Sequence, residues 1–221
     1  MMVAHHALFN AVAFLGAPRW VFSNPVFDIL QPFFVGLFVL VSGISSRFSK
    51  GNIERGAICI VFAVLVTYVT VRMDMPIYFG ILHKLGFFMI FYGLTRKFWD
   101  KIEPKAAPIL YITLILSSIA ARIFFSPTSD NLVIRDILSV LGWRQTGFSG
   151  FDYQPILPGI FIFLFGTWAG RYIREEKFPK WFYEAKFPIF PAIGRKALMI
   201  YLLHQPVLFS LTMLFAYLLS L

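Results

Sequence analysis

Long apolar stretches, separated by short polar connections, run along most of the chain. About 20 apolar residues in an α-helix cross the ~30 Å hydrocarbon layer of a bilayer, and most of these stretches approach that length. The pattern therefore predicts an all-α polytopic membrane protein, a bundle of about seven transmembrane helices in a single transmembrane domain over residues 1–221. The predicted spans are residues 1–16, 26–46, 55–71, 77–95, 106–122, 155–173 and 196–220.

The connections between these spans are short except for residues 123–154, which contain SPTSDN and the glycine-rich GWRQTGFSGFD. Long connections without a regular pattern often carry function. We expect this segment to form a lid, a short interfacial helix or a re-entrant piece. The sequence shows no internal repeat and no low-complexity segment.

The composition supports the membrane class. Hydrophobic residues make up 58% of the 221 residues and charged residues 14%, against about 25% charged residues in an average soluble domain. A soluble domain of this size could not bury so much apolar surface, so that class is excluded. The single cysteine, Cys59, excludes a disulfide within one chain and is expected to be a packing residue.

The basic residues indicate an orientation in the membrane. Fourteen of the 20 Lys and Arg residues lie in three connections, after the second, fourth and sixth spans. Because positive connections face the cytoplasm, we expect a cytoplasmic N-terminus and an extracytoplasmic C-terminus. The net charge of +9 then reflects attraction to the lipid bilayer, and no nucleic-acid partner is expected.

The first span is unusual. Its ~16 residues measure ~24 Å, which is short of the hydrocarbon layer. A signal peptide would need a basic n-region and an uninterrupted apolar h-region, but the segment MMVAHH lacks the first and places two histidines in the second. We therefore expect the true start to lie upstream of Met1, so that this helix is truncated.

All four histidines fall inside predicted spans: His5, His6, His83 and His204. At 1.5 Å per residue, His6, His83 and His204 lie ~15, ~10 and ~12 Å deep, so they could share one cavity. Intramembrane ionisable residues are functional candidates by default, although each ring could also only join neighbouring helices by a hydrogen bond. His5 and His6 lie ~100° apart on a helix, so one of them is expected to face the site.

Three charged residues lie near this predicted cavity. Lys84, about two turns inside a span, needs a carboxylate, a water-filled cavity or a route to the surface for its ammonium group. Asp28 and Asp152 are the outer acids closest to predicted helix starts. A carboxylate there also suits the helix dipole, which is the simpler explanation for either one alone.

The segment HQP, residues 204–206, interrupts the last apolar run. Pro206 removes a backbone donor and frees the carbonyl four residues earlier, and Gln205 could satisfy such a group on a neighbouring helix. Irregular backbone at membrane depth is tolerated where it lines a cavity. We therefore expect the HQP segment to line a polar cavity.

Four motifs stand out: DILQPFFVGLFVLVSGIS (28–45), FGILHKLG (79–86), DYQPILPGIFIFLFG (152–166) and IGRKALMIYLLHQPVL (193–208). Together they resemble the catalytic domain of the heparan-α-glucosaminide N-acetyltransferase family, in its small bacterial and archaeal members. GILH and GR-x-x-L-x-I-Y-L-x-HQPV are the most specific parts. The resemblance implies transfer of an acyl group, such as acetyl, from cytosolic acyl-CoA to an acceptor on the extracytoplasmic side, expected to be a sugar, glycan or other small molecule.

Carried over by position, the resemblance places Asp28 and Asp152 at the openings of the second and sixth helices. His83 matches the GILH histidine, and His204 with Gln205 matches the HQP segment. The predicted catalytic set is His6, Asp28, His83, Lys84, Asp152 and His204.

The chain departs from the family pattern in two places. The Asp-x-x-Arg-Gly segment that usually opens the first helix is absent, which supports a start upstream of Met1. Lysosomal members are understood to use a histidine in the loop between the first two helices, and this chain has Pro18 at that position. Their mechanism therefore does not carry over unchanged.

The chemistry of acyl transfer suits the predicted residues. An amine or hydroxyl acceptor must lose a proton as it attacks a thioester, and His6 or His204 is the predicted base. The carbonyl oxygen gains charge, which Lys84 or Gln205 could stabilise. CoA phosphates need cations at the cytoplasmic mouth, where the candidates are Arg47, Lys50, Arg195 and Lys196. Each of these four could equally be an ordinary positive-inside residue.

Two other functions fit parts of the pattern. Intramembrane histidines also bind haem or metals, but no predicted helix has the paired histidines about four turns apart that would favour this, and no metal is expected. A carrier with a midplane site is the other alternative, which the missing internal repeat weakens. The acceptor, the acyl chain, the choice between direct transfer and an acyl-histidine intermediate, and the oligomeric state are not readable from the sequence.

Overall fold

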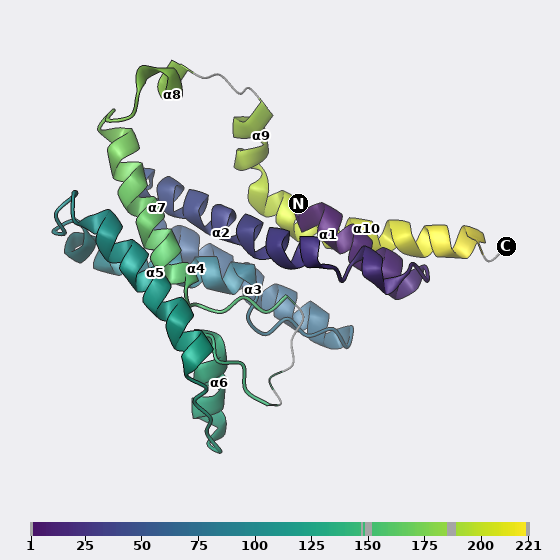
Figure 1. Ribbon diagram of the computed structural model, residues 1–221. Coiled ribbons are helices and arrows are strands. Elements are labelled where there is room, and N and C mark those ends of the chain that lie inside the picture. The colour runs from purple at the N-terminus through teal and green to yellow at the C-terminus, as the bar shows by residue number, and fades with distance from the viewer. Residues whose placement is uncertain (1, 147, 149–151, 185–188, 220–221) are drawn as a thin grey trace. The chain divides into compact units, whose positions relative to one another are not determined.

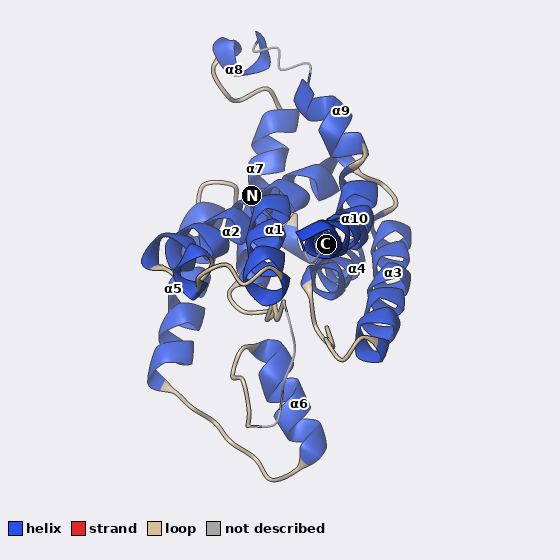
Figure 2. Ribbon diagram, turned by 90° about the vertical axis from the view of Figure 1, so that its right-hand side faces the viewer, coloured by secondary structure: helices blue, strands red, loops and turns tan. Residues whose placement is uncertain are grey.

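The computed structural model describes residues 2–146, 148, 152–184 and 189–219, and over these residues it contains helices and no strand (Figure 2). Met1 and Ser220 at the ends of two predicted spans, the basic residue Lys186 and part of the glycine-rich segment lie outside the described residues. The elements are α1 (Met2–Phe14), η1 (Arg19–Val21), α2 (Pro25–Phe48), α3 (Asn52–Arg72), α4 (Ile81–Trp99), α5 (Ala107–Phe124), α6 (Leu132–Leu141), α7 (Gly159–Arg174), α8 (Lys180–Glu184), α9 (Ile189–Arg195) and α10 (Ala197–Leu219).

Each of the predicted spans coincides with one of these helices. The largest differences are at α4 and α7, which begin four residues later than the spans 77–95 and 155–173. Four helical segments of the described chain are long and apolar enough to cross a membrane, and α1 is a shorter apolar helix. These segments are Arg19–Phe48, Asn52–Arg72, Ala107–Phe124 and Ala197–Leu219. The all-helical membrane class is therefore confirmed.

The chain forms two compact units. The first consists of Met1–Val35 and Phe178–Leu221, and the second of Gly36–Lys177. Within the first unit, α1 and α10 pack against each other (Figure 1), and η1 contacts α1. Helix α10 continues as a helix through Pro206.

In the second unit, α3 and α4 form the most extensive helix pair (Figure 1). Gly56 and Gly86 lie where the two backbones meet. A Cβ atom on Gly56 would lie 2.8 Å from the carbonyl oxygen of Gly86, and one on Gly86 would lie 2.9 Å from that of Gly56. Small residues at such a crossing let membrane helices approach closely enough for extensive van der Waals contact.

The core of the second unit lies between α4 and α7. Phe88, Tyr92 and Phe163 are fully buried, and the ring of Phe163 contacts both of the other rings, at centroid distances of 5.6 and 6.3 Å. Helix α7 also packs against α5. This core holds the start of α7, and with it the segment around Asp152, close to the start of α4.

The long connection 123–154 contains a ten-residue helix, α6, and the expectation that such a helix lies at the membrane interface stays a prediction. The side chain of Asn131 accepts hydrogen bonds from the N–H groups of Val133 and Ile134 and so caps the helix. The helix ends at Gly142, whose φ of +142° a side chain would strain. An open pocket of about 510 Å³ lies between the end of α5 and the connections on either side of α6, and its lining includes Arg122 and Trp143.

Candidate active site

His6 on α1 and His204 on α10 lie together in the first unit. Their ring centroids are 5.0 Å apart, and both side chains are half-buried. The ring of His5 instead packs against Phe22 and Phe27, at centroid distances of 4.6 and 6.1 Å. Of the two adjacent histidines, His6 therefore faces His204.

The hydrogen bond of His204 fixes which ring nitrogen carries the proton. Nδ1 is bonded to the backbone carbonyl oxygen of Tyr201. Because a carbonyl only accepts, Nδ1 must be the protonated nitrogen, and Nε2 of the neutral ring carries a lone pair. Nε2 is buried and has no hydrogen-bond partner among the described residues. The ring is therefore oriented with an available base.

Asn10 and Gln205 form a partly buried amide pair between the same two helices. Gln205 Nε2 donates to Asn10 Oδ1 over 3.1 Å, and Asn10 is fully buried. Asn10 Nδ2 and Gln205 Oε1 are buried without a hydrogen-bond partner among the described residues. Together with His204 Nε2, the α1–α10 contact therefore holds three unpaired polar atoms.

Asn10 was not among the predicted site residues, although the sequence contains a signal for it. It lies four residues after His6, which is about one helical turn and places both on the same face of α1. A polar side chain inside an apolar span is a functional candidate, and this argument applies to the amide of Asn10 as it does to the histidines.

His83 lies in the second unit, and both of its ring nitrogens are hydrogen-bonded. The N–H of Gly80 donates to Nδ1 over 3.3 Å, so the neutral ring carries its proton on Nε2. Nε2 lies 3.3 Å from Thr67 Oγ1, and that hydroxyl donates to the carbonyl of Ile77 over 2.6 Å. His83 thus links the start of α4 to the end of α3 and to the connection between them.

Lys84 is almost completely buried, with 5% of its surface exposed. Its ammonium group lies against the start of α7, since a Cβ on Gly159 would lie 2.8 Å from Nζ. Nζ also lies 6.0 Å from the centroid of the Phe88 ring. A side chain at position 159 would displace the ammonium group, so the glycine makes room for it.

Asp152 lies close to the start of α4. One of its carboxyl oxygens would be 3.5 Å from a Cβ on Gly80, and the other accepts a hydrogen bond from Gln154 over 3.4 Å. Burial raises the pKa of Asp152 to about 6, although the Gln154 bond and the charge of Lys84 both act to lower it. The carboxyl therefore titrates between pH 5 and 7.

The other predicted residues occupy two kinds of environment. Asp28, in the first turn of α2, is exposed, and so are three of the four candidate phosphate-binding residues: Lys50, Arg195 and Lys196. The fourth, Arg47, is buried, with 6% of its surface exposed.

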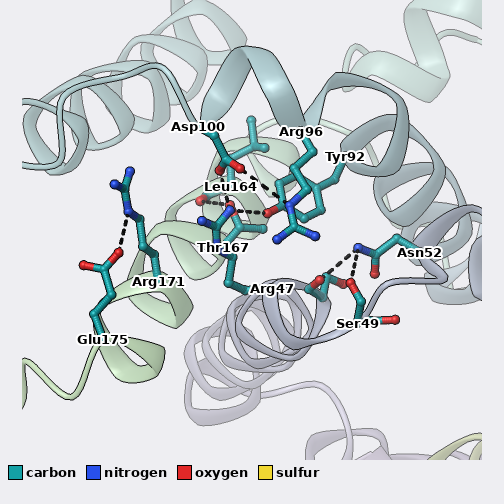
Figure 3. Close-up of polar contacts among 11 residues, drawn as sticks. Arg47, Ser49, Asn52, Tyr92, Arg96, Asp100, Leu164, Thr167, Arg171 and Glu175 are labelled. Carbon is teal, nitrogen blue, oxygen red and sulfur yellow. Dashed lines mark hydrogen bonds and ion pairs between the residues drawn. The ribbon is translucent and has the colours of Figure 1, made fainter.

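Arg47 is held by neighbouring side chains (Figure 3). Its guanidinium donates to the hydroxyl of Tyr92 over 3.0 Å and forms an ion pair with Asp100 at the end of α4. Nε of Arg96 lies 3.6 Å from the other oxygen of Asp100. Arg47 therefore stabilises the contact between α2 and α4 through bonds that a bound phosphate would have to compete with.

The predicted site residues fall into the two units. His6, His204, Asp28, Arg195 and Lys196 belong to the first, and His83, Lys84, Asp152, Arg47 and Lys50 belong to the second. The prediction that His6, His83 and His204 share one cavity therefore stays a prediction. In the described part of the chain, no three His, Cys, Asp or Glu side chains are grouped as a metal site would require.

One protein family matches most of the chain. The family model described as heparan-alpha-glucosaminide N-acetyltransferase, catalytic, matches residues 1–206. None of the curated proteins and none of the solved structures matches the chain. The family match contains the first three motifs and residues 193–206 of the fourth, and it confirms the resemblance that they indicated.

Proposed function

The chain belongs to the heparan-α-glucosaminide N-acetyltransferase catalytic-domain family, and from this we propose that it is a membrane-bound acyltransferase. It takes an acetyl group from acetyl-CoA in the cytosol. It transfers this group to an amine or hydroxyl on the extracytoplasmic side, carried by a sugar or glycan. The observation that most favours a reaction centre in this chain is Nε2 of His204, which is buried beside the ring of His6 and has no hydrogen-bond partner in the described part of the chain.

We further propose that the chain crosses the membrane about seven times as one domain. The four long apolar helices and α1 account for five of these spans, and α4 and α7 supply the other two. The excess of Lys and Arg in three connections supports a cytoplasmic N-terminus and an extracytoplasmic C-terminus.

His204 is the proposed base. The lone pair of the acceptor attacks the thioester carbonyl carbon, and the acceptor's proton moves to His204 Nε2. The C–S bond then breaks, and the thiolate leaves as CoA–SH with the proton from His204 Nε2–H. The hydrogen bond from Nδ1 to Tyr201 holds the ring in the required tautomer throughout, and His6 lies beside it as a second imidazole.

Other residues are proposed to complete the polar centre and to bind the substrates. Lys84 and Asp152 supply a buried positive charge and a titratable carboxyl, and His83 holds the start of α4 that carries Lys84. Asp28, exposed at the start of α2, accepts hydrogen bonds from the acceptor.

The cytosolic donor needs cations for its phosphates. Lys50, Arg195 and Lys196 are exposed and are proposed to bind the CoA phosphates. The guanidinium of Arg47 already contacts Asp100 and Tyr92, so its contribution is to shape this surface.

The test is consumption of acetyl-CoA by the purified full-length protein in detergent, measured as free thiol released with and without glucosamine as acceptor. The proposal expects thiol release by the parent and its loss in a folded His204→Ala variant. If the folded parent neither binds nor consumes acetyl-CoA or longer acyl-CoAs, the proposed function is wrong.

A further inference from the structure

The amide pair between α1 and α10 has hydrogen-bonding groups that the two side chains do not use on each other. Asn10 and Gln205 share one hydrogen bond, which leaves an N–H group of Asn10 and the carbonyl oxygen of Gln205 without partners among the described residues. The lone pair of His204 Nε2, on the residue next to Gln205, is the third unpaired atom. One donor and two acceptors are thus buried in one helix contact.

Leaving these atoms unpaired is unfavourable. An unsatisfied buried polar group costs about 1–3 kcal/mol, and hydrocarbon offers no water to replace the missing partner. A pair that only joined two helices would be expected to use both of its hydrogen-bonding edges. The open edges therefore point to a ligand that brings one acceptor and at least one donor.

The reacting groups of acyl transfer match this requirement. The thioester carbonyl is an acceptor, and it becomes a stronger one as its oxygen gains negative charge in the transition state. The amine or hydroxyl that attacks it is a donor. An acyl group and an acceptor bound at this contact would therefore satisfy the atoms that the protein leaves unpaired.

We propose that Asn10 is a catalytic residue that donates from Nδ2 to the carbonyl oxygen of the acyl group, and that Gln205 positions it. The proposal rests on the proposed acyltransferase function. As the acceptor attacks, the carbonyl π electrons move onto the oxygen, where Asn10 Nδ2–H stabilises the charge, and the acceptor's proton moves to His204 Nε2. When the C–S bond breaks, the carbonyl re-forms and the thiolate takes that proton.

Gln205 acts through Asn10 rather than on the substrate carbonyl. Its Nε2 holds Asn10 Oδ1, which fixes the plane of the Asn10 amide and so the direction of its N–H bonds. Its own free Oε1 is available to a second hydrogen of the acceptor. A mobile Asn10 amide would lose part of its effect, because preorganised donors stabilise a transition state most.

The decisive variant is Asn10→Asp in the full-length protein, with acetyl-CoA as donor and glucosamine as acceptor. Aspartate keeps the oxygen that accepts from Gln205 and replaces the donating amide nitrogen by a second oxygen. We expect kcat to fall ~100-fold, as when an oxyanion donor is removed, while KM for acetyl-CoA changes less than about 3-fold. Gln205→Ala should lower kcat by a smaller factor, and the double variant should lose less than the product of the two single losses, because part of the effect of Gln205 acts through Asn10.

Asn24→Asp is the matched control. It makes the same chemical change in the same unit, and its Oδ1 keeps accepting from the N–H groups of Val26 and Phe27. Its kcat should equal that of the parent. Asn10→Ser, which keeps a donor in a smaller side chain, serves if Asn10→Asp does not fold, and it should retain more activity than Asn10→Ala.

The outcomes separate this proposal from the function on which it rests. An active parent with an equally active Asn10→Asp variant overturns the role of Asn10 and leaves the acyltransferase function intact. If every Asn10 variant loses activity only because its melting temperature falls below the assay temperature, the pair has a structural role. That result also overturns the proposal. A folded parent that consumes no acyl-CoA overturns both.

Discussion

His83 and His204 both lie in apolar segments next to a polar residue, yet the structure gives them different hydrogen bonds. The ring of His83 is bonded at both nitrogens, to Gly80 and to Thr67. The ring of His204 is bonded at one nitrogen, and the other is buried without a partner among the described residues. The first arrangement suits a ring that holds helices together, and the second suits a ring that exchanges a proton.

The difference follows from where each histidine lies in its helix. His83 is the third residue of α4, where the first backbone N–H groups have no carbonyl partner. Its Nδ1 accepts from such a group, which leaves Nε2 to bond the hydroxyl of Thr67. His204 is the eighth residue of α10, where N–H groups are used within the helix. Its Nδ1 instead donates to the carbonyl of Tyr201 one turn earlier, and Nε2 is left with its lone pair.

The largest expected effect is the loss of activity on His204→Ala. Removal of a general base lowers the rate by about 10²–10⁴-fold, and the melting temperature should change little because the ring contributes one local hydrogen bond. The measurement is kcat for thiol release from acetyl-CoA together with thermal unfolding in detergent.

Thr212→Ala is the control on the same helix. Its hydroxyl donates to the carbonyl of Leu208, so the variant also removes one side-chain hydrogen bond to the backbone of α10. It should keep the activity of the parent. Equal losses in His204→Ala and Thr212→Ala would show that α10 is merely sensitive to substitution.

His83→Ala should act mainly on stability. It leaves the N–H of Gly80 without its partner, which costs about 1–3 kcal/mol, while the hydroxyl of Thr67 keeps its bond to the carbonyl of Ile77. Thr67→Val breaks the same network, so the double variant should lose less than the sum of the two single losses. The free energy of unfolding of all three variants checks this. A His83→Ala variant as stable as the parent but inactive would place His83 in the chemistry instead.

Asp152 makes the stability of the second unit depend on pH. Its folded-state pKa of about 6 lies above the ordinary 3.8, so between these values the folded protein keeps a proton that the unfolded chain has released. Stability therefore falls as the pH rises from 4 to 6. The loss is at most about 3 kcal/mol, and the partial exposure of the side chain reduces it.

Asp152→Asn should remove this pH dependence, and Asp130→Asn, at an exposed carboxylate, should keep it. Thermal unfolding measured between pH 4 and pH 7 compares the three proteins. The same slope in the Asp152→Asn variant would assign the pH dependence to other groups.

The helices were predictable because each one follows from a local property of the sequence. An apolar run of sufficient length adopts a helix wherever it lies, and the predicted spans agree with the helices to within a few residues. One difference is at the end of α4. The predicted span ends at residue 95, whereas the helix continues through Arg96 and Lys97 to Trp99. Apolarity alone ends the span at the first charges, whereas backbone hydrogen bonding carries the helix beyond the hydrocarbon.

The site was less predictable because it depends on partners from distant parts of the chain. The sequence indicates that His204 and Gln205 are polar, but only the contact with α1 shows that Gln205 bonds Asn10. In the same way, Arg47 is one of several basic residues near helix ends until Asp100 and Tyr92 are seen beside it. A ring tautomer or an ion pair cannot be derived from spacing along one segment.

The smallest expected effect concerns the cations. Lys50 is exposed, whereas Arg47 is bonded to Asp100 and Tyr92. Lys50→Ala should therefore raise KM for acetyl-CoA by about 2–5-fold, as for a solvent-exposed ion pair, and added salt should weaken the effect. Arg47→Ala should instead lower the melting temperature, because it removes the ion pair with Asp100 and the hydrogen bond to Tyr92. Arg72→Ala should leave KM unchanged, because Arg72 follows the third predicted span and so lies on the extracytoplasmic side in the predicted topology. A KM that rises as much for Arg72→Ala as for Lys50→Ala would mean that net charge, rather than a phosphate site, attracts the donor.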